Sequence, residues 1–206
     1  MALLLILASM IFVMAAPDGR WSDVIILILE GGALFASLRA AQSGYRLRLF
    51  CGVTIGIALV GAIGLSALGE DGAVVFAKWA SLLLVLLAAP VISVGLIRQV
   101  KEKQAITLHT MMGVLCIYLL MAISFASSYA LINEMGAEPF FRHGDGGDTL
   151  SNYLYFSLTT ITTAGLGDFA PATDLGRSLT AAEALIGQIY LVTVVAVIVG
   201  NLGRKR

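Results

Sequence analysis

The sequence predicts an all-α protein of the membrane, and three observations lead to this fold class. Of the 206 residues, 59% are hydrophobic and only 13% are charged, and the mean hydropathy is +0.93. A soluble domain carries about 25% charged residues, so most of this chain cannot face water. The apolar residues also gather in long segments whose length suits helices that cross a bilayer. Finally, the basic residues gather on one side of these segments.

This composition excludes several classes of protein. So little charge argues against a secreted disulfide scaffold, a cytosolic enzyme and a nucleic-acid binder. The formal net charge is zero, so no long-range field attracts nucleic acid. Cys51 and Cys116 both lie inside apolar segments, where a cysteine behaves as a small buried hydrophobe. We therefore expect no nucleic-acid partner, no disulfide and no metal site built from cysteines.

Six apolar segments are candidate transmembrane helices, since a helix needs about 20 mostly apolar residues to cross a bilayer. Five of them approach or exceed this length: 24–38, 49–68, 73–97, 106–132 and 178–202. The remaining segment, 2–16, is shorter and is either a short first span or a signal peptide that ends near Ala15 and Ala16. No basic residue precedes it, which disfavours the signal peptide.

The basic residues predict the orientation of these spans. Nine of the 13 basic residues fall on one side: Arg39, Arg46, Arg48, Arg98, Lys101, Lys103, Arg204, Lys205 and Arg206. The positive-inside rule makes this side cytoplasmic, and six spans then place both termini in the cytoplasm. We expect a multi-pass protein of the cell membrane, either a prokaryotic inner membrane or a plasma membrane, with the lipid bilayer as its partner.

One interval on the outer side, residues 133–177, does not fit a simple loop. Within it, residues 149–162 (TLSNYLYFSLTTIT) predict a short helix with Ser151 or Asn152 as its N-cap. This helix is too short and too rich in hydroxyl groups to span. A half-helix at membrane depth is tolerated only where protein or a water-filled cavity surrounds it, so we expect a re-entrant helix.

The predicted short helix runs directly into the residues TTAGLGD at 162–168. Gly165 and Gly167 allow backbone conformations that other residues avoid, so successive carbonyls can point along one line. Such a line, with the Thr163 hydroxyl at its inner end, can replace the water shell of a monovalent cation. The partial negative charge at the end of the short helix also favours a cation. One chain supplies only one wall of such a site, so several chains must surround an axis.

This segment resembles the tetrameric potassium channels, whose filter reads TVGYGD. The resemblance runs from about Ile106 to the C-terminus, through YFSLTTITTAGLGDFAPAT and through EALIGQIYLV, which is similar to the inner helix of small prokaryotic members. It implies a homotetramer in which residues 106–206 form a pore domain. This domain would contain an outer helix, a pore helix at 149–162, a filter at 163–168 and an inner helix at 178–203. Residues 1–105 would form a separate module of four spans.

The resemblance also implies roles for individual residues. The residues expected to bind permeant potassium ions are Thr163, Ala164, Gly165 and Leu166, with Gly167 completing the outer mouth. The residues expected to support the filter are Asp168, Tyr155 and Thr159. Gly187 lies 22 residues after Gly165 and would be a gating hinge. The residues expected to line the inner cavity are Thr162, Gln188, Leu191 and Val195; for Gln188, a hydrogen bond to the pore helix is the alternative.

Two filter positions depart from the family pattern. Ala164 replaces the usual Val or Ile, and Leu166 replaces Tyr, although a GLG filter also occurs in one half of some two-pore-domain channels. Neither change removes a carbonyl, but Leu166 lacks the hydroxyl that tethers the usual tyrosine. We expect a potassium channel that is not an enzyme and has no organic cofactor; a weakly selective Na⁺/K⁺ channel is the alternative.

Two further classes of function share part of this pattern. Intramembrane aspartyl proteases contain a GxGD motif like the one ending at Asp168, but they need a second carboxylate as partner. No Asp occurs within the six apolar segments, and the two acids there, Glu30 and Glu183, lack the expected context. The other alternative is a membrane subunit with a purely structural role, although residues 185–202 carry no charge that would obstruct an ion.

The first four spans carry too few charges for a voltage sensor. Sensors place arginines at every third position of their fourth helix, whereas segment 73–97 contains only Lys78. We therefore expect opening that does not depend steeply on voltage. Glu30 and Lys78 lie at matching depths below the outer ends of their spans, so we expect them to form a structural ion pair.

Overall fold

The described part of the chain is helical. The computed structural model describes residues 2–15, 108–136, 138–142 and 149–195, with shorter stretches at 25, 28–29, 31–32, 52–57, 60–61, 79–80 and 83. Within these ranges the extended structure is limited to an isolated β-bridge between Phe141 and Pro171. The all-α prediction is therefore confirmed for the described residues, whereas most of the predicted spans between 24 and 97 lie outside them.

Helix α5 is the longest of the described helices. It covers Leu108–Met135, and its part Met111–Met135 is long and apolar enough to cross a membrane, with a mean hydropathy of 2.0. The helix continues three residues beyond the predicted end at Ile132. Helix α1, Ala2–Ala15, is a shorter apolar helix.

Helix α6, Leu150–Ile161, is the predicted short helix, and its boundaries are set by two threonines. The predicted N-cap at Ser151 or Asn152 is wrong. Thr149 is the N-cap: its backbone is extended, and its hydroxyl accepts a hydrogen bond of 3.2 Å from the Asn152 amide. A threonine hydroxyl that accepts from the amide three residues later is a normal N-cap arrangement, so the helix begins before Ser151.

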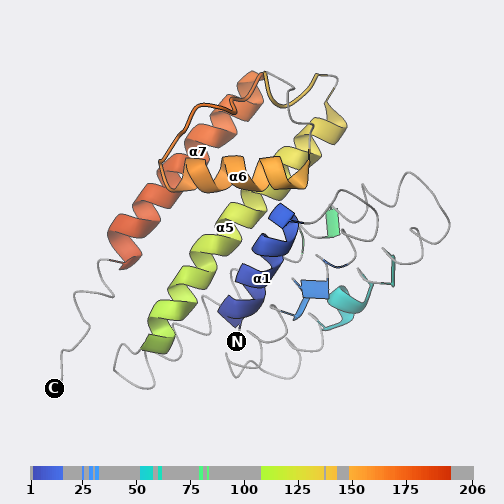
Figure 1. Cartoon of the computed structure of the whole chain (residues 1–206), viewed down its shortest axis with the longest axis vertical. Helices are drawn as coiled ribbons and strands as arrows, with labels where there is room; N and C mark the ends of the chain where they lie inside the picture. Colours follow the sequence, from blue (N-terminus) through green and yellow to red (C-terminus); the bar gives the residue numbers. More distant parts are fainter. Residues whose placement is uncertain are drawn as a thin grey trace.

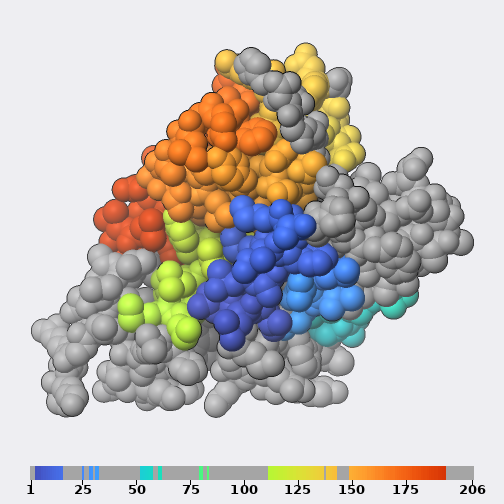
Figure 2. All heavy atoms as spheres, in the orientation of Figure 1, coloured from blue at the N-terminus to red at the C-terminus, as the bar shows by residue number. Residues whose placement is uncertain are grey.

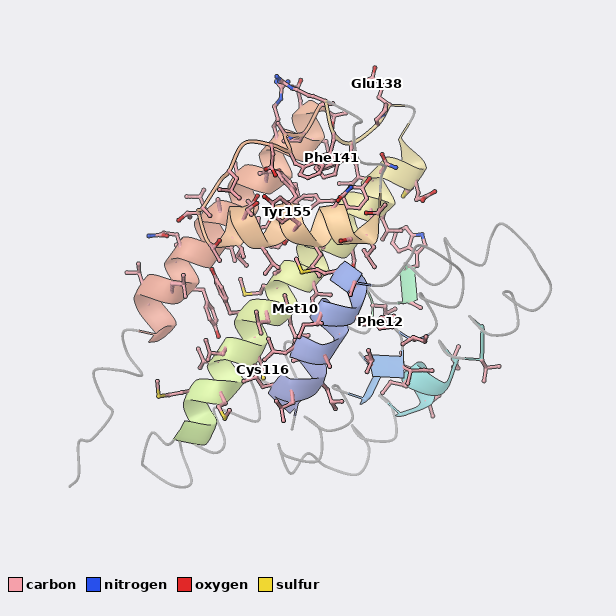
Figure 3. All side chains as sticks on the ribbon, in the orientation of Figure 1. Met10, Phe12, Cys116, Glu138, Phe141 and Tyr155 are labelled. Atoms are coloured by element: carbon pink, nitrogen blue, oxygen red, sulfur yellow. The ribbon has the colours of Figure 1, made fainter. Side chains whose placement is uncertain are left out.

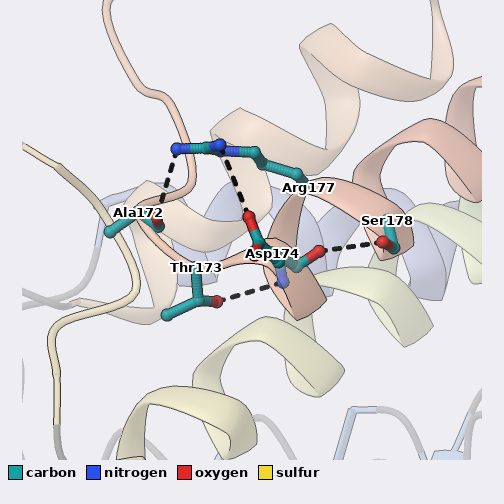
Figure 4. Close-up of polar contacts among 6 residues, drawn as sticks. Ala172, Thr173, Asp174, Arg177 and Ser178 are labelled. Carbon is teal, nitrogen blue, oxygen red and sulfur yellow. Dashed lines mark hydrogen bonds and ion pairs between the residues drawn. The ribbon is translucent and has the colours of Figure 1, made fainter.

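Helix α7, Asp174–Tyr190, begins four residues before the predicted start at residue 178. The cause is a cap of Thr173, whose hydroxyl accepts a hydrogen bond of 3.1 Å from the Gly176 amide. Asp174 then lies in the first turn, where its charge suits the helix dipole, and Arg177 contacts it at 3.5 Å (Figure 4). The helix continues into a π-helical turn, Leu191–Val195; the rest of the predicted inner helix lies outside the described residues.

Helices α5 and α7 run side by side, and α6 crosses both of them (Figure 1). Helix α1 packs against α5 and α6, so that its surface adjoins the α6 region in Figure 2. Ile6 and Met10 of α1 are buried in the same core as Leu120, Leu154 and Phe156. The short helix α6 therefore has protein on several sides, which is the condition for a helix that does not span.

Hydrogen bonds between helices supplement this packing. Lipid tails are as apolar as the side chains they would replace, so packing and interhelical hydrogen bonds, not hydrophobicity, hold helices together in a bilayer. Ser157 of α6 donates to the Ala122 carbonyl of α5 at 2.7 Å. Tyr190 of α7 donates to the Val114 carbonyl of α5 at 2.7 Å. These bonds fix α6 and α7 against the long helix.

Candidate functional site

The segment after α6 has a backbone in which the sign of φ alternates. Thr163, Gly165 and Gly167 have φ values of +58°, +51° and +82°, and the residues between them do not have positive φ. For a non-glycine residue such as Thr163 this conformation costs about 1–2 kcal/mol. Alternation of this kind turns successive carbonyls toward one side, and strain of this kind is typical of functional sites.

Backbone hydrogen bonds attach this segment to the end of α6. The Thr163 amide donates to the Thr160 carbonyl at 2.9 Å, and the Gly165 amide donates to the Thr159 carbonyl at 3.0 Å. Thr159 therefore contacts the segment through its backbone; its hydroxyl donates to the Phe156 carbonyl instead. The geometry of residues 163–165 is thus fixed by the position of α6.

Residues 162–168 are all exposed in the single chain. The Leu166 side chain is 67% exposed and does not belong to the buried clusters of the described residues. The five predicted ion-binding residues, Thr163 to Gly167, therefore form one continuous exposed strip of backbone. A single chain covers this strip on one side only.

Asp168 lies beside Tyr155 of α6, the aromatic residue predicted with it to support the filter. The Tyr155 phenol donates a hydrogen bond of 2.8 Å to Asp168 Oδ2, and the Phe169 amide donates to Oδ1 at 3.1 Å. The hydrogen bond to Asp168 raises the pKa of the Tyr155 phenol, so the phenol keeps the proton that it donates. The Phe169 ring packs 5.9 Å from the Tyr155 ring. The bond between Tyr155 and Asp168 fixes the C-terminal end of the exposed strip.

Removing this contact should weaken ion discrimination without unfolding the chain. In Tyr155→Phe the ring still packs on Phe169, but nothing donates to Asp168 from α6. We expect a severalfold lower preference for potassium over sodium at unchanged thermal stability, because the bond is exposed. Reversal potentials of the variant and the unmodified protein measure this, and an unchanged preference would show that the bond does not support the site.

An aromatic cluster behind the strip was not predicted from the sequence. The loop after α5 pairs with the segment after Asp168, since the Ala172 amide donates to the Phe140 carbonyl at 2.7 Å. In Figure 3, Phe141 of this loop lies above α6, and its ring is 4.8 Å from that of Phe169. The rings of the cluster belong to Tyr129, Phe140, Phe141, Tyr153, Phe156 and Phe169. The concentration of aromatic residues at 153–156 is the sequence signal that could have indicated this cluster.

At its C-terminal end, α6 contacts both α5 and α7 through Ile161. The Ile161 carbonyl is one of the carbonyls that a helix end leaves without a partner, and the Tyr118 phenol of α5 donates to it at 2.8 Å. On the other side, a Cβ added at Gly187 of α7 would lie 2.5 Å from Ile161 Cγ1 and 2.6 Å from its carbonyl oxygen. Gly187 therefore lets α7 approach α6; its predicted role as a hinge remains a prediction.

This part of the chain is similar to known proteins. Residues 113–203 match the family model described as "Ion channel". The match covers 91 of the 206 residues. A stretch of 46 residues is also 50% identical to "Probable potassium channel protein 2" of Methanocaldococcus jannaschii. That stretch covers 21% of this chain and 13% of the relative, so the chain matches only a small part of that protein. No solved structure matches the chain.

The residues predicted to line an inner cavity lie at the end of α6, on α7 and in the π-helical turn that follows it. Thr162, Gln188 and Leu191 are all exposed in the single chain. The Thr162 hydroxyl donates to the Leu158 carbonyl at 2.6 Å, which keeps it within the last turn of α6. The backbone of Val195 ends the described part of the inner helix. The predicted pair of Glu30 and Lys78 lies outside the described residues and stays a prediction.

Proposed function

We propose that the protein is a cation channel that conducts potassium passively through a fourfold filter of backbone carbonyls. The observation that carries this proposal is the alternating φ of Thr163, Gly165 and Gly167 in an exposed segment attached to the end of α6. An ordinary loop would not need a threonine in the left-handed region. The match of residues 113–203 to an ion-channel family supports the same function.

The carbonyls of four residues would supply the oxygens that replace the hydration shell of potassium. These residues are Thr163, Ala164, Gly165 and Leu166, with the Thr163 hydroxyl at the inner end. The negative end of the α6 dipole lies at Thr162, where it favours a cation in the cavity. Gly167 and Asp168 complete the outer mouth. Since Ala164 and Leu166 would contribute only their carbonyls to the ion, neither substitution removes an oxygen from the filter.

The same geometry favours a homotetramer. A filter must surround the ion, whereas residues 162–168 of one chain are exposed along their whole length. Apolar side chains of α7 are also exposed in the single chain: Leu185 is 64% exposed and Ile189 is 59% exposed. Four copies around an axis would place the strips face to face. We further propose a multi-pass protein of the cell membrane, with residues 1–105 as a module without steep voltage dependence.

Potassium flux into liposomes tests the proposed function. The full chain, reconstituted with potassium on one side, should dissipate the gradient, whereas protein-free liposomes should not. Thr163→Ala keeps the backbone and its strain but removes the inner hydroxyl, so we expect slower flux at unchanged assembly. If correctly assembled protein carries no potassium at all, the channel proposal is wrong.

A further inference from the structure

Glu183 is a fully buried carboxyl group that the proposed conduction pathway does not use. It lies on α7 with 0% of its side chain exposed. The Tyr129 phenol of α5 donates to its Oε2 atom at 2.5 Å, and its Oε1 atom forms a hydrogen bond with the Ser157 hydroxyl of α6. One carboxyl group therefore connects α5, α6 and α7.

The hydrogen bonds around Glu183 need more protons than its neighbours supply. Three bonds are present: Tyr129 with Oε2, Ser157 with Oε1, and Ser157 with the Ala122 carbonyl at 2.7 Å. Tyr129 and Ser157 carry one hydroxyl proton each. The bond to the Ala122 carbonyl can take its proton only from Ser157. The bond between Ser157 and Oε1 must then take its proton from Glu183.

Among the described residues, no basic side chain is paired with Glu183 that would neutralise a charged carboxylate. The titratable groups that face Glu183 from the described residues are the phenols of Tyr129 and Tyr118 on α5. The neighbouring polar group on α6 is Ser157, and on α7 itself Thr180 donates to the Gly176 carbonyl. No ion pair between Glu183 and a basic side chain is present among the described residues. A buried charge without a partner is strongly disfavoured.

We propose that Glu183 is a neutral carboxylic acid in the folded protein, and that it is a positioning residue for the filter. Through Ser157 it holds α6 between α5 and α7. Ser157 lies one turn before Ile161, and the amides of Thr163 and Gly165 bond to the carbonyls of that last turn. A displacement of α6 would therefore move the carbonyl strip. The positioning role of Glu183 rests on the proposed channel function, whereas its neutral state does not.

The neutral acid has a matched substitute in glutamine. The Gln carbonyl can accept from Tyr129 and its amide can donate to Ser157, which reproduces the proton arrangement of a carboxylic acid. We expect Glu183→Gln to keep the melting temperature and potassium flux of the unmodified protein. Glu183→Leu should lose most of both, because it leaves the Tyr129 phenol without its acceptor. Glu138→Gln, on an exposed loop, is the control and should change neither.

Infrared spectroscopy of the full-length protein at neutral pH tests the protonation directly. The difference spectrum between the unmodified protein and Glu183→Gln should contain the carbonyl band of a protonated carboxylic acid. The difference spectrum with Glu138→Gln is the control and should lack the band assigned to Glu183. In Ser157→Ala the acid band should shift, because its hydrogen-bond acceptor is gone. A carboxylate band assigned to Glu183 would overturn the proposal whether or not the protein conducts.

The pH dependence of flux tests the positioning role. Raising the pH removes the proton from Glu183, so flux through the unmodified protein should fall at high pH. Flux through Glu183→Gln should stay constant over the same range. The same fall in both proteins, or full flux in a folded Glu183→Leu variant, would overturn the positioning role. Absence of flux in every protein, with an acid band present, would instead contradict only the channel function.

Discussion

Gly187→Ala is expected to abolish potassium flux and to lower the thermal stability of the protein. The added Cβ would lie 2.5 Å from Ile161 Cγ1 and 2.6 Å from the Ile161 carbonyl oxygen, so α7 and α6 must separate. Overpacking of a tight site typically costs about 1–3 kcal/mol, and one of the two contacts here is backbone, which cannot move aside. The same separation would disturb the Tyr118 bond to that carbonyl.

A matched glycine provides the control for this substitution. A Cβ added at Gly56, also in a helical stretch, would meet nothing within 4 Å. Gly56→Ala should therefore be neutral or slightly stabilising, since Ala favours a helix by up to about 1 kcal/mol over Gly. Thermal melting and flux of both variants decide the matter. Unchanged melting and flux in Gly187→Ala would show that α7 does not need this close approach.

Gly165→Ala is expected to abolish conduction while leaving the fold intact. With φ at +51°, an alanine here is strained by about 1–2 kcal/mol in each chain, and the strain would recur in every subunit of the proposed tetramer. Relief of this strain would rotate the backbone to negative φ and turn a carbonyl away from the strip. Space is not the cause, because an added Cβ at Gly165 meets nothing within 4 Å in the single chain.

A neighbouring substitution separates the backbone effect from the loss or gain of a side chain. Leu166 is exposed and does not have positive φ, so Leu166→Ala should keep its carbonyl in place and retain potassium flux. Both variants should keep the fold of the unmodified protein, since residues 162–168 are exposed in the single chain. Normal flux in Gly165→Ala would mean that the alternating backbone is not the conduction path.

Local signals in the sequence were enough to find α6 and the strip that follows it. The residues 149–162 predicted the helix that the structure shows at Leu150–Ile161 with its two flanking caps. The N-cap itself was misplaced because several hydroxyl and amide side chains are near the start, and only backbone geometry selects Thr149. The early start of α7 has a similar cause, since Thr173 is a good cap that apolar periodicity does not detect.

The contacts that position the strip could not be predicted, because they join residues far apart in the sequence. The Tyr118 bond to Ile161 spans 43 positions, and the Tyr129 bond to Glu183 spans 54. Such bonds depend on how the helices cross, which no local pattern encodes. The glycine at 187 was recognised by its spacing, but its close contact with Ile161 became visible only in three dimensions.

Reversal potentials with potassium on one side of the membrane and sodium on the other test the central claim most directly. The account predicts a reversal potential shifted toward potassium, because the carbonyls of residues 163–166 and the Thr163 hydroxyl are retained. Leu166→Tyr should shift it further, since a phenol can tether the strip in a way that leucine cannot. A reversal potential of zero, with equal permeability to both ions, would contradict the potassium assignment and favour a nonselective cation channel.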